Sequence, residues 1–362
     1  MEILQIVFFS AALLLVLYNL IVFLGLSRIR NTDGSQSGEI NFSIIIAAKN
    51  EEKNIPQLIA ALKQIEYKTD NFEVIIIDDN STDNTFAVCS ELIAGMNNYH
   101  TYRVSNKMFP GKKGALNFGI AKAKYSFILI TDADCRPSPG WLKDFSNLFH
   151  KGYDFIFGKA PFEAEENIVN KISCFENLRS SILTFSFANI GFPYSATARN
   201  FGFKKSSFEK IEGYQNTTET LSGDDDLLLR EAIRNKMKIG TLNGRDSFVF
   251  STTKKSLSAY LKQRSRHTKT SLYYLPSRQF NIGIWHLINM FCLFSPLFLA
   301  VNILLIIPFF IKIFFDIITG LVYQKRFGYK FNLVEIFYLQ ILYEALIIIN
   351  FAGAIFRKDS WN

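Results

Sequence analysis

Residues 127–135 read Phe-Ile-Leu-Ile-Thr-Asp-Ala-Asp-Cys, and this stretch decides the interpretation of the whole chain. Its apolar part is typical of a buried strand in an α/β sheet. Ligands of open α/β sheets bind beyond the carboxyl ends of the strands, so we expect Asp132 and Asp134 at a ligand-binding edge. Mg²⁺ is typically held by one or two carboxylates together with phosphates and water. A solvated turn is the alternative, because Asp is a common turn residue.

Strand-like and helix-like segments alternate along the first half of the chain. Strands are expected at 42–48, 72–77, 99–104 and 127–130, with helices at 55–65, 85–96 and 112–123 between them. Such alternation predicts an α/β fold with a mostly parallel, Rossmann-like sheet. Polar clusters follow three of these strands, at 48–51, 78–83 and 132–134. This recurrence predicts a nucleotide site at one edge of the sheet. Further on, we expect a helix at 168–187 and a strand at 196–203.

The composition favours a membrane over a nucleic acid as the partner of a basic chain. The 362 residues carry a formal net charge of +8, and 49% of them are hydrophobic. Positive charge suits either partner, but long apolar stretches occupy both ends of the chain. The four cysteines show no metal-binding or disulfide spacing, which indicates a reducing compartment.

The N-terminal apolar stretch, Ile3 to Leu26, is long enough to cross a bilayer as a helix. A signal peptide would carry a basic segment before a shorter apolar core, whereas here Arg28 and Arg30 follow the core. The positive-inside rule then places the N-terminus outside and the following domain in the cytoplasm. We therefore predict an uncleaved anchor in the cell (inner) membrane.

The C-terminal region is apolar again, and the number of its membrane spans stays open between two and three. Residues 288–315 form either one tilted span or part of a hairpin that continues to 322, and 333–352 form a further span. Basic residues 325, 326 and 330 would be cytoplasmic if two membrane-spanning helices precede them. Arg357 and Lys358 instead favour the other of the two possible numbers of spans.

Two clusters could bind a nucleotide and its phosphates. Asp78-Asp79 could accept hydrogen bonds from a base or ribose, or could form a capping turn with residues 81–83. Residues 111–117, Gly-Lys-Lys-Gly-Ala-Leu-Asn, place two lysines at a helix start, where phosphate is attracted. A solvated basic turn is the alternative, and the spacing is not that of a Walker loop.

Two later clusters could act on the reacting groups. Asp224-Asp225-Asp226 begins a helix, a position that favours negative charge, but three adjacent carboxylates exceed what a helix cap needs. One of them could be a general base if its neighbours raise its pKa. Residues 263–267, Gln-Arg-Ser-Arg-His, could clamp a diphosphate or contact anionic lipid.

Six motifs stand in the order found in the family 2 glycosyltransferases with a GT-A fold. They are IIAAKNE at 45–51, IDDNSTD at 77–83, GKKGALN at 111–117, TDAD at 131–134, GDDDL at 223–227 and QRSRH at 263–267. The chain most resembles the membrane-anchored branch that includes cellulose, hyaluronan and poly-N-acetylglucosamine synthases. The resemblance covers roughly residues 40 to 270.

The resemblance implies a role for each matched residue. The nucleotide of the donor would be held by Ala48, Glu51, Asp78, Asp79, Lys113 and Asp132. Asp134, with Asp132, would hold Mg²⁺ or Mn²⁺. Asp225 would be the catalytic base, with Asp224 almost as good a match. The diphosphate and acceptor would be contacted by Gln263, Arg264, Arg266 and His267.

The hydropathy pattern and the resemblance together predict five segments, and the resemblance implies an activity. The segments are an anchor at 1–28, a linker at 29–40, a GT-A catalytic domain at 41–255, an amphipathic juxtamembrane segment at 256–282 and a transmembrane region at 283–362. The implied reaction is an inverting, metal-dependent transfer from a nucleotide-sugar, expected to be a UDP-sugar, to a lipid or membrane-bound glycan acceptor.

One departure from the family pattern bears on processivity. His267 stands where the family usually has Trp, a residue that helps to form the acceptor site of polymerising members. We therefore expect a single addition. The alternatives are a processive polysaccharide synthase and a catalytically silent nucleotide-binding scaffold of the envelope. A nucleotidyltransferase would need a Gly-rich phosphate loop after the first strand, and residues 47–51 do not provide one.

Overall fold

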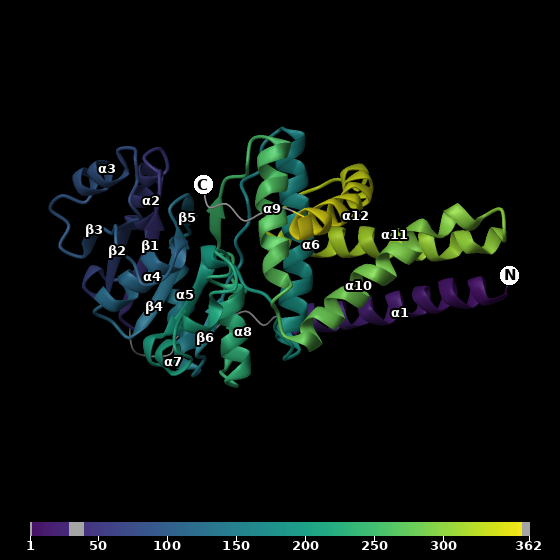
Figure 1. The fold of residues 1–362 in the computed structure, drawn as a ribbon, viewed down its shortest axis with the longest axis horizontal. Helices are drawn as coiled ribbons and strands as arrows, with labels where there is room; N and C mark the ends of the chain where they lie inside the picture. Colours follow the sequence, from purple (N-terminus) through teal and green to yellow (C-terminus); the bar gives the residue numbers. More distant parts are fainter. Residues whose placement is uncertain (1, 29–39, 357–362) are drawn as a thin grey trace. The chain divides into compact units, whose positions relative to one another are not determined.

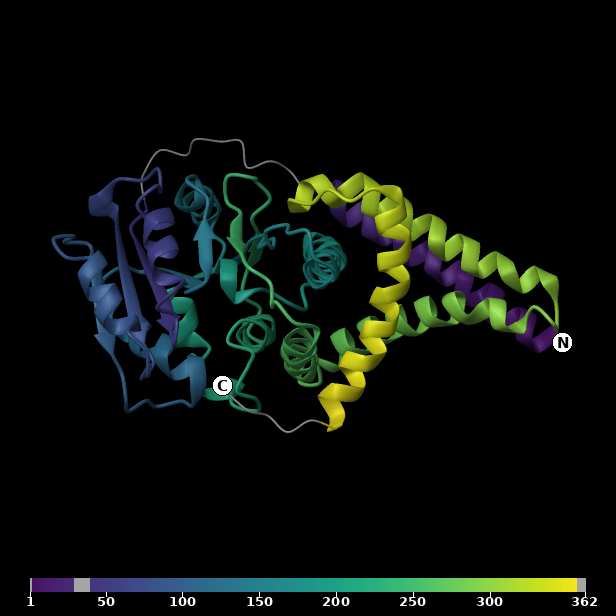
Figure 2. The ribbon, with the colours of Figure 1, turned by 90° about the horizontal axis from the view of Figure 1, so that it is seen from above.

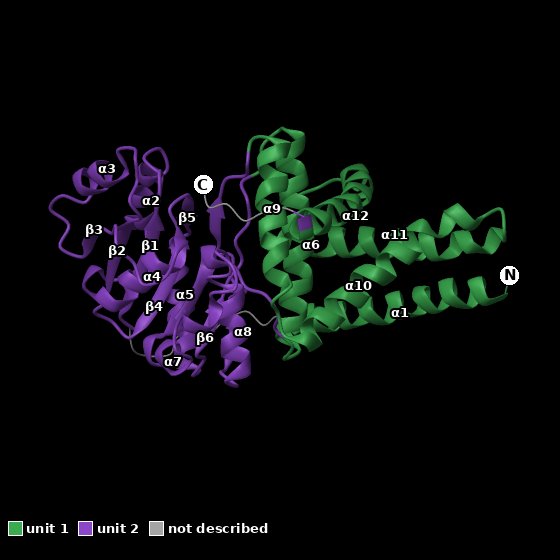
Figure 3. Ribbon diagram, viewed as in Figure 1, with its two compact units in different colours: residues 1–29, 164–192, 255–355 green, residues 30–163, 193–254, 356–362 purple. Residues whose placement is uncertain are grey.

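The structure is a computed structural model that describes residues 2–28 and 40–356. Contacts divide the chain into two compact units, which are described separately (Figure 3). Unit 1 comprises residues 1–29, 164–192 and 255–355, and unit 2 comprises 30–163, 193–254 and 356–362. The segment 164–192, expected within the catalytic domain, therefore clusters with the terminal helices. Most of the expected linker, residues 29–39, lies outside the described residues.

Unit 2 is built on a seven-stranded, mostly parallel sheet with strand order β3-β2-β1-β4-β7-β6-β8 (Figure 1). The parallel core consists of β1 (Phe42–Ala48), β2 (Phe72–Asp78), β3 (Tyr99–Arg103) and β4 (Phe127–Asp132). Next come β7 (Phe201–Lys204), antiparallel to β4 and β6, then β6 (Phe155–Phe157) and β8 (Ile239–Thr241). The expected α/β fold is confirmed, and all four strands predicted for its parallel core are present.

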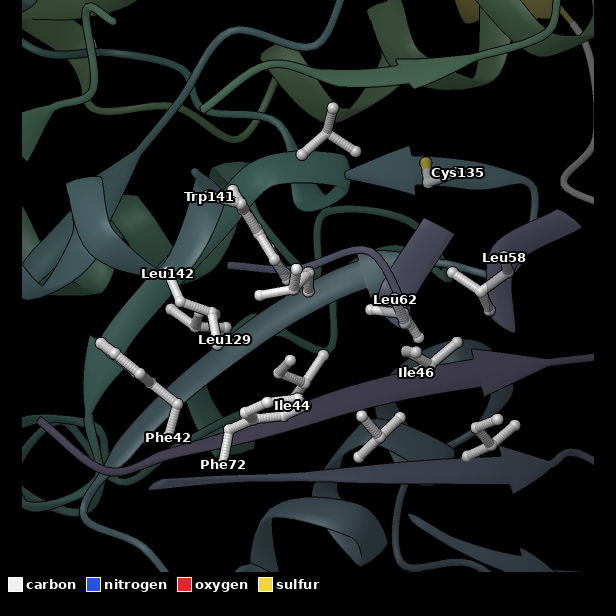
Figure 4. Packing of buried hydrophobic residues seen from close by; sticks show 14 of the residues in the cluster. Phe42, Ile44, Ile46, Leu58, Leu62, Phe72, Leu129, Cys135, Trp141 and Leu142 are labelled. Carbon is white, nitrogen blue, oxygen red and sulfur yellow. The ribbon is translucent and has the colours of Figure 1, made fainter. Parts of the chain in front are cut away.

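Successive side chains of a β-strand point to opposite faces of the sheet. Each face therefore packs against its own set of helices. Phe42, Ile44 and Ile46 of β1 belong to the main hydrophobic core (Figure 4). That core also draws on α2 (Ile55–Leu62), α3 (Thr85–Leu92) and α5 (Trp141–His150). On the opposite face, α4 (Gly111–Lys122) approaches so closely that a β-carbon on Gly119 would lie 3.2 Å from Ile77.

The rest of unit 2 brings the later acidic cluster into this domain. It consists of α7 (Lys205–Lys210), α8 (Asp226–Arg234), a two-stranded sheet of β5 (Cys135–Pro137) with β9 (Val249–Ser251), and the 3₁₀ turns η1 (Thr69–Asn71), η2 (Ala198–Asn200) and η3 (Gln215–Thr217). The strand expected at 196–203 is wrong in its first half, where η2 stands. The η2 turn brings the Ala198 amide to the carboxylate of Asp225, at 2.8 Å.

All regular elements in the described residues of unit 1 are helices or 3₁₀ turns. Its helices are α1 (Glu2–Ser27), α6 (Ile168–Asn189), α9 (Leu257–Ser271), α10 (Pro276–Phe294), α11 (Ile306–Tyr323) and α12 (Leu333–Phe356), with 3₁₀ turns η4 (Ser295–Phe298), η5 (Ile303–Leu305) and η6 (Gln324–Phe327). Figure 2 shows α1, α10 and α11 running alongside one another. The segment 288–315 is therefore not one span but parts of two helices. Helix α10 begins at Pro276, inside the range expected to be juxtamembrane.

Four helices of unit 1 are long and apolar enough to cross a membrane. They cover Glu2–Ser27, Pro276–Phe298, Ile303–Phe327 and Leu333–Phe356. About 20 apolar residues are needed for a helix to cross the hydrocarbon core, and each of the four meets that length. These helices indicate that the chain associates with a membrane.

Candidate active site

The carboxyl ends of β1, β2 and β4 lie side by side and carry the predicted residues. Ala48 pairs in register with Asp78, and Ala47 pairs with Asp132. The next residue of the chain, Asp79, donates its amide hydrogen to the Ala48 carbonyl at 2.7 Å. One edge of the sheet therefore gathers Ala48, Asp78, Asp79 and Asp132, as the sequence predicted.

The two aspartates after β2 have different surroundings. Asp78 is fully buried, and its carboxylate accepts hydrogen bonds from Arg103 Nε at 2.6 Å and from the Ser81 amide at 3.2 Å. Asp79 forms an ion pair with Lys107, whose ammonium also donates to the Gly111 carbonyl at 2.9 Å. Because its partners come from its own turn and from β3, Asp78 stabilises the turn. Asp79 is held instead by a lysine from the loop before α4.

Glu51 joins this edge through the loop after β1. Its amide donates to Thr85 Oγ1 at 2.8 Å, and its carboxylate accepts from Asn54 Nδ2 at 2.5 Å. Burial raises the pKa of Glu51; the Asn54 hydrogen bond opposes this, and the negative charge of Asp134 adds to it. Glu51 therefore lies within electrostatic reach of the Asp-x-Asp pair.

Asp132, Asp134 and Cys135 form a group of potential metal ligands whose ligand atoms all lie within 4.8 Å of one another. Burial, followed by the neighbouring Asp132 charge, raises the pKa of Asp134, as expected for two carboxylates that share a site without a cation. Burial also raises the pKa of the Cys135 thiol, with both aspartates adding to it, so the thiol stays protonated. The donors that remain are carboxylate oxygens, which suit a hard cation such as Mg²⁺ or Mn²⁺.

Lys112 connects the Asp-x-Asp pair to the later acidic cluster. Its ammonium lies 2.5 Å from Asp132 Oδ1 and 2.7 Å from Asp224 Oδ2, so one cation holds carboxylates from β4 and from the start of α8. Burial is the largest single effect and would raise the pKa of Asp224, but the charge and the hydrogen bond of Lys112, with smaller contributions from a backbone hydrogen bond and Lys113, together lower it. Asp224 is therefore ionised beside the candidate metal ligands.

Asp225 is the N-cap of α8, and backbone amides contact both of its carboxylate oxygens. Oδ1 accepts from the Asp226 amide at 2.7 Å, and Oδ2 accepts from the Ala198 amide at 2.8 Å. Burial, with the charges of Asp226 and Asp224, raises the pKa of Asp225 well above its ordinary value. A raised pKa is what a general base near neutral pH needs.

Asp226 is held by the segment just before η2, and Asp225 by the first residue of η2. Its Oδ1 accepts from Ser195 Oγ at 2.8 Å and from the Ala196 amide at 2.9 Å. Each of the three adjacent carboxylates therefore has its own partners. Asp224 and Asp225 remain the two candidates for the base.

Lys113, which the resemblance places near the nucleotide, contacts backbone carbonyls of its own unit, and its role at the nucleotide stays a prediction. Its side chain is buried, and its ammonium donates to the carbonyls of Thr217 and, at 3.0 Å, Thr220. Burial lowers the pKa of Lys113, with Asp224 acting in the opposite direction. The lysine of this pair that contacts site carboxylates is Lys112.

Sequence reasoning missed two further cations near the candidate metal ligands. The Arg199 guanidinium lies 4.2 Å from the centre of the Phe162 ring and donates to Ser251 Oγ at 2.5 Å. The charges of Arg199 and Lys254 both lower the pKa of Asp134 against the effect of burial. Neither residue belongs to a recognisable pattern, so no sequence signal marks them.

The Gln263–His267 segment lies on α9 in unit 1. Arg264 Nε donates to Glu176 Oε1 at 2.6 Å, and Tyr260 Oη donates to Glu176 Oε2 at 2.5 Å, so both side chains hold α9 against α6. Gln263 and Arg266 are three residues apart and share another face of the helix. Their contact with a diphosphate stays a prediction.

Several known proteins resemble this chain in sequence. Residues 43–212 match glycosyl transferase family 2. The beta-monoglucosyldiacylglycerol synthase of Nostoc sp. is 36% identical over 126 residues, which are 34% of this chain and 27% of that enzyme. The match thus spans about a quarter of that relative's length. A Methanococcus voltae enzyme, dolichyl N-acetyl-alpha-D-glucosaminyl phosphate 3-beta-D-2,3-diacetamido-2,3-dideoxy-beta-D-glucuronosyltransferase, is 26% identical over 89% of this chain and 99% of its own.

Among solved structures, the chain resembles the mannosyltransferase PcManGT from Pyrobaculum calidifontis, which was solved in complex with GDP-Man and Mn²⁺. The TM-score is 0.62 at 16% identity, over 99% of this chain and 98% of that one. This likeness confirms the expected GT-A type of fold. Residues 43–212, slightly less than half of the chain, therefore match glycosyl transferase family 2, and the fold of the chain is of the type seen in this mannosyltransferase.

Proposed function

We propose that this protein is an inverting glycosyltransferase that moves one sugar from a nucleoside-diphosphate sugar to a hydroxyl of a lipid or lipid-linked acceptor. The observation that carries the proposal is the Lys112 bridge between Asp132 and Asp224. It joins the carboxylates suited to a metal–diphosphate with the carboxylates suited to a base.

The nucleotide would lie over the carboxyl ends of β1 and β2. Asp79 would accept a hydrogen bond from the base or ribose, and Glu51 and the Ala48 backbone would border the same pocket. Asp78 would support them through its bonds to Arg103 and Ser81. A bound Mg²⁺ or Mn²⁺, held by Asp132 and Asp134, would offset the charge of the diphosphate.

The transfer itself needs a base on the acceptor side of the anomeric carbon. The acceptor oxygen forms a bond to that carbon as the bond to the diphosphate oxygen breaks, which inverts the configuration. The hydroxyl proton passes to a carboxylate of the acidic cluster, and the nucleoside diphosphate leaves. Asp225 is our first choice for this carboxylate because its pKa is raised, and Asp224 is the second.

Two observations support an acceptor from the membrane. The chain has four helices long and apolar enough to cross a bilayer. The names of the two curated relatives describe transferases that make a glycolipid or act on a dolichyl-phosphate-linked sugar. We propose that the protein is multi-pass and that its catalytic unit faces the cytoplasm, because Arg28 and Arg30 follow α1.

The proposal is tested by assaying the full chain, purified in detergent, for release of nucleoside diphosphate from a panel of UDP- and GDP-sugars. Extracted membrane lipid serves as the acceptor, with Mn²⁺ or with a chelator. We expect one donor to be consumed only with metal and lipid. Asp134→Asn and Asp225→Asn should each lower the rate at least about 100-fold, since each removes a group with a direct role.

Asp70→Asn is the matched control, because Asp70 is an acidic residue of the same unit on the surface turn η1. It should leave the rate unchanged. Donor binding without turnover, unaffected by Asp225→Asn, would contradict an enzymatic function and favour a silent scaffold.

A further inference from the structure

Three helices of unit 1 form a bundle with a defined direction for each helix. Aromatic contacts of α1 fix the register, because its early residues meet the end of α10 while its late residues meet the end of α11. The ring centroids are separated by 5.2 Å for Phe8 and Phe298, 5.7 Å for Tyr18 and Trp285, and 5.5 Å for Phe23 and Tyr323. Hence α10 runs antiparallel to α1, and α11 runs parallel to it.

One end of this bundle is basic. Arg326 donates to the Leu26 carbonyl at 3.2 Å, so the ends of α1 and α11 lie together. Arg28, Lys325 and Lys330 lie in the same short segments of sequence. Because basic residues flank spans on the cytoplasmic side, this end of the bundle is the cytoplasmic one.

Helix α6 runs across that basic end. A β-carbon on Gly25, near the end of α1, would lie 2.7 Å from the Ser186 carbonyl carbon, so the two helices are in tight contact there. Further along, α6 contacts the η6 turn and the segment after it. These contacts join Phe185 to Phe327, with ring centroids 5.5 Å apart, and Asn177 to Tyr329, with a 2.7 Å hydrogen bond.

Helix α12 contacts α6 through side chains at two places. Its first turn forms the ion pair of Glu335 with Lys171, at 2.7 Å, and eight residues later the Tyr343 ring lies 6.3 Å from the Phe175 ring. Eight residues advance a helix by about 12 Å, so a helix that crossed the bilayer would have left α6 behind. Figure 2 shows α12 running transverse to the direction of α1, α10 and α11.

A buried ion cluster fixes this crossing. Lys312 of α11 has no exposed surface, and its ammonium lies 2.6 Å from Asp316 and 2.9 Å from Glu344 of α12. Asp316 also pairs with Arg179 of α6, at 2.7 Å. Two positive and two negative charges balance, which is how ionisable groups are tolerated within apolar helices. The cluster thereby ties α12 and α6 to α11.

We propose that the chain crosses the membrane three times, through α1, α10 and α11, and that α12 lies along the cytoplasmic leaflet without crossing. This arrangement removes the conflict between the flanking charges. Basic residues precede α12 at 325, 326 and 330 and follow it at 357 and 358, so both of its flanks belong on the cytoplasmic side. Exposed Val334, Phe337 and Ile355 would contact acyl chains of that leaflet.

The test is cysteine accessibility in the full chain, in membranes of intact and permeabilised cells. The four native cysteines are buried, so the unmodified chain gives the background. Three single variants are compared: Val301→Cys in the turn between α10 and α11, Lys330→Cys before α12, and Ser360→Cys after it. A membrane-impermeant maleimide is the probe.

We expect Val301→Cys to be labelled in intact cells, and Lys330→Cys and Ser360→Cys to be labelled only after permeabilisation. Labelling of Ser360→Cys in intact cells, with Lys330→Cys protected, would show that α12 crosses and would overturn the proposal. Depth can be measured independently by labelling Val334→Cys, Leu342→Cys and Ile355→Cys with a fluorophore that nitroxide lipids quench. Equal depths are expected, whereas a crossing helix would place position 342 clearly deepest.

Discussion

At the scale of single residues, the two adjacent lysines at the start of α4 have separate roles. Lys112 lies between Asp132 and Asp224, whereas Lys113 donates to the carbonyls of Thr217 and Thr220. The sequence motif places both lysines at a helix start but says nothing of which carbonyls or carboxylates each one meets. Asp132 is 20 positions later, but the other three partners come from residues more than 100 positions later, so only the folded chain reveals them.

Lys113→Met should destabilise the fold without weakening the donor site directly. Two carbonyls would lose a buried donor, which costs about 1–3 kcal/mol. We expect a lower melting temperature, measured by differential scanning fluorimetry, and an unchanged dissociation constant for nucleoside diphosphate. Lys122→Met, on the same helix, is the control and should change neither. A large loss of nucleotide affinity in Lys113→Met would instead assign this lysine to the donor site.

Lys112→Met should reverse the sign of the contribution that Asp224 makes to the pH dependence of folding stability. The pKa of Asp224 is lowered in the folded chain, so its contribution to stability is present above its unfolded pKa and is lost as pH falls. Without Lys112, burial raises that pKa, and the carboxylate then opposes folding as pH rises. Breaking such a pair costs about 3 kcal/mol. The variant's melting temperature should therefore fall further below the wild type at about pH 7.5 than at about pH 4.5; an equal deficit would count against the bridge.

At the scale of elements, the parallel core was predictable because its signals are local. Apolar runs with polar clusters at their ends gave β1, β2 and β4, and periodic apolar residues gave α2 and α4. The strand expected at 196–203 failed in its first half because the antiparallel strand β7 and the preceding η2 turn depend on pairing with distant strands. The affiliation of α6 with the helical unit also depends on distant contacts.

Gly25→Val should disturb the contact between α1 and α6. A β-carbon at this position would lie 2.7 Å from the Ser186 carbonyl carbon, which is backbone and cannot rotate away. Overpacking of this kind costs about 1–3 kcal/mol. We expect the variant in detergent to aggregate at a lower temperature. The midpoint is measured by size-exclusion chromatography of samples heated to a series of temperatures. Gly283→Val is the control, because nothing lies within 4 Å of a β-carbon there; equal effects of the two would refute the close contact.

At the scale of the whole molecule, the chain joins a segment that matches glycosyl transferase family 2, residues 43–212, to a set of apolar helices. The sequence predicted both parts, since the six motifs and the apolar stretches are each visible without the fold. It could not settle the number of spans, because hydropathy and length describe a helix but not the direction in which it runs. The direction of α12 follows from its contacts with α6 and α11.

We infer that the carboxylates at the ends of β4 and β2 together bind one nucleotide and its metal ion. The most direct test is calorimetric titration of the full chain with UDP and with GDP, with and without Mn²⁺, in wild type, Asp134→Asn and Asp70→Asn. We predict that Mn²⁺ tightens binding of one nucleotide at least about tenfold, equivalent to about 1.4 kcal/mol. The gain should disappear in Asp134→Asn and persist in Asp70→Asn. Metal-independent binding, or a gain that survives in Asp134→Asn, would contradict the claim.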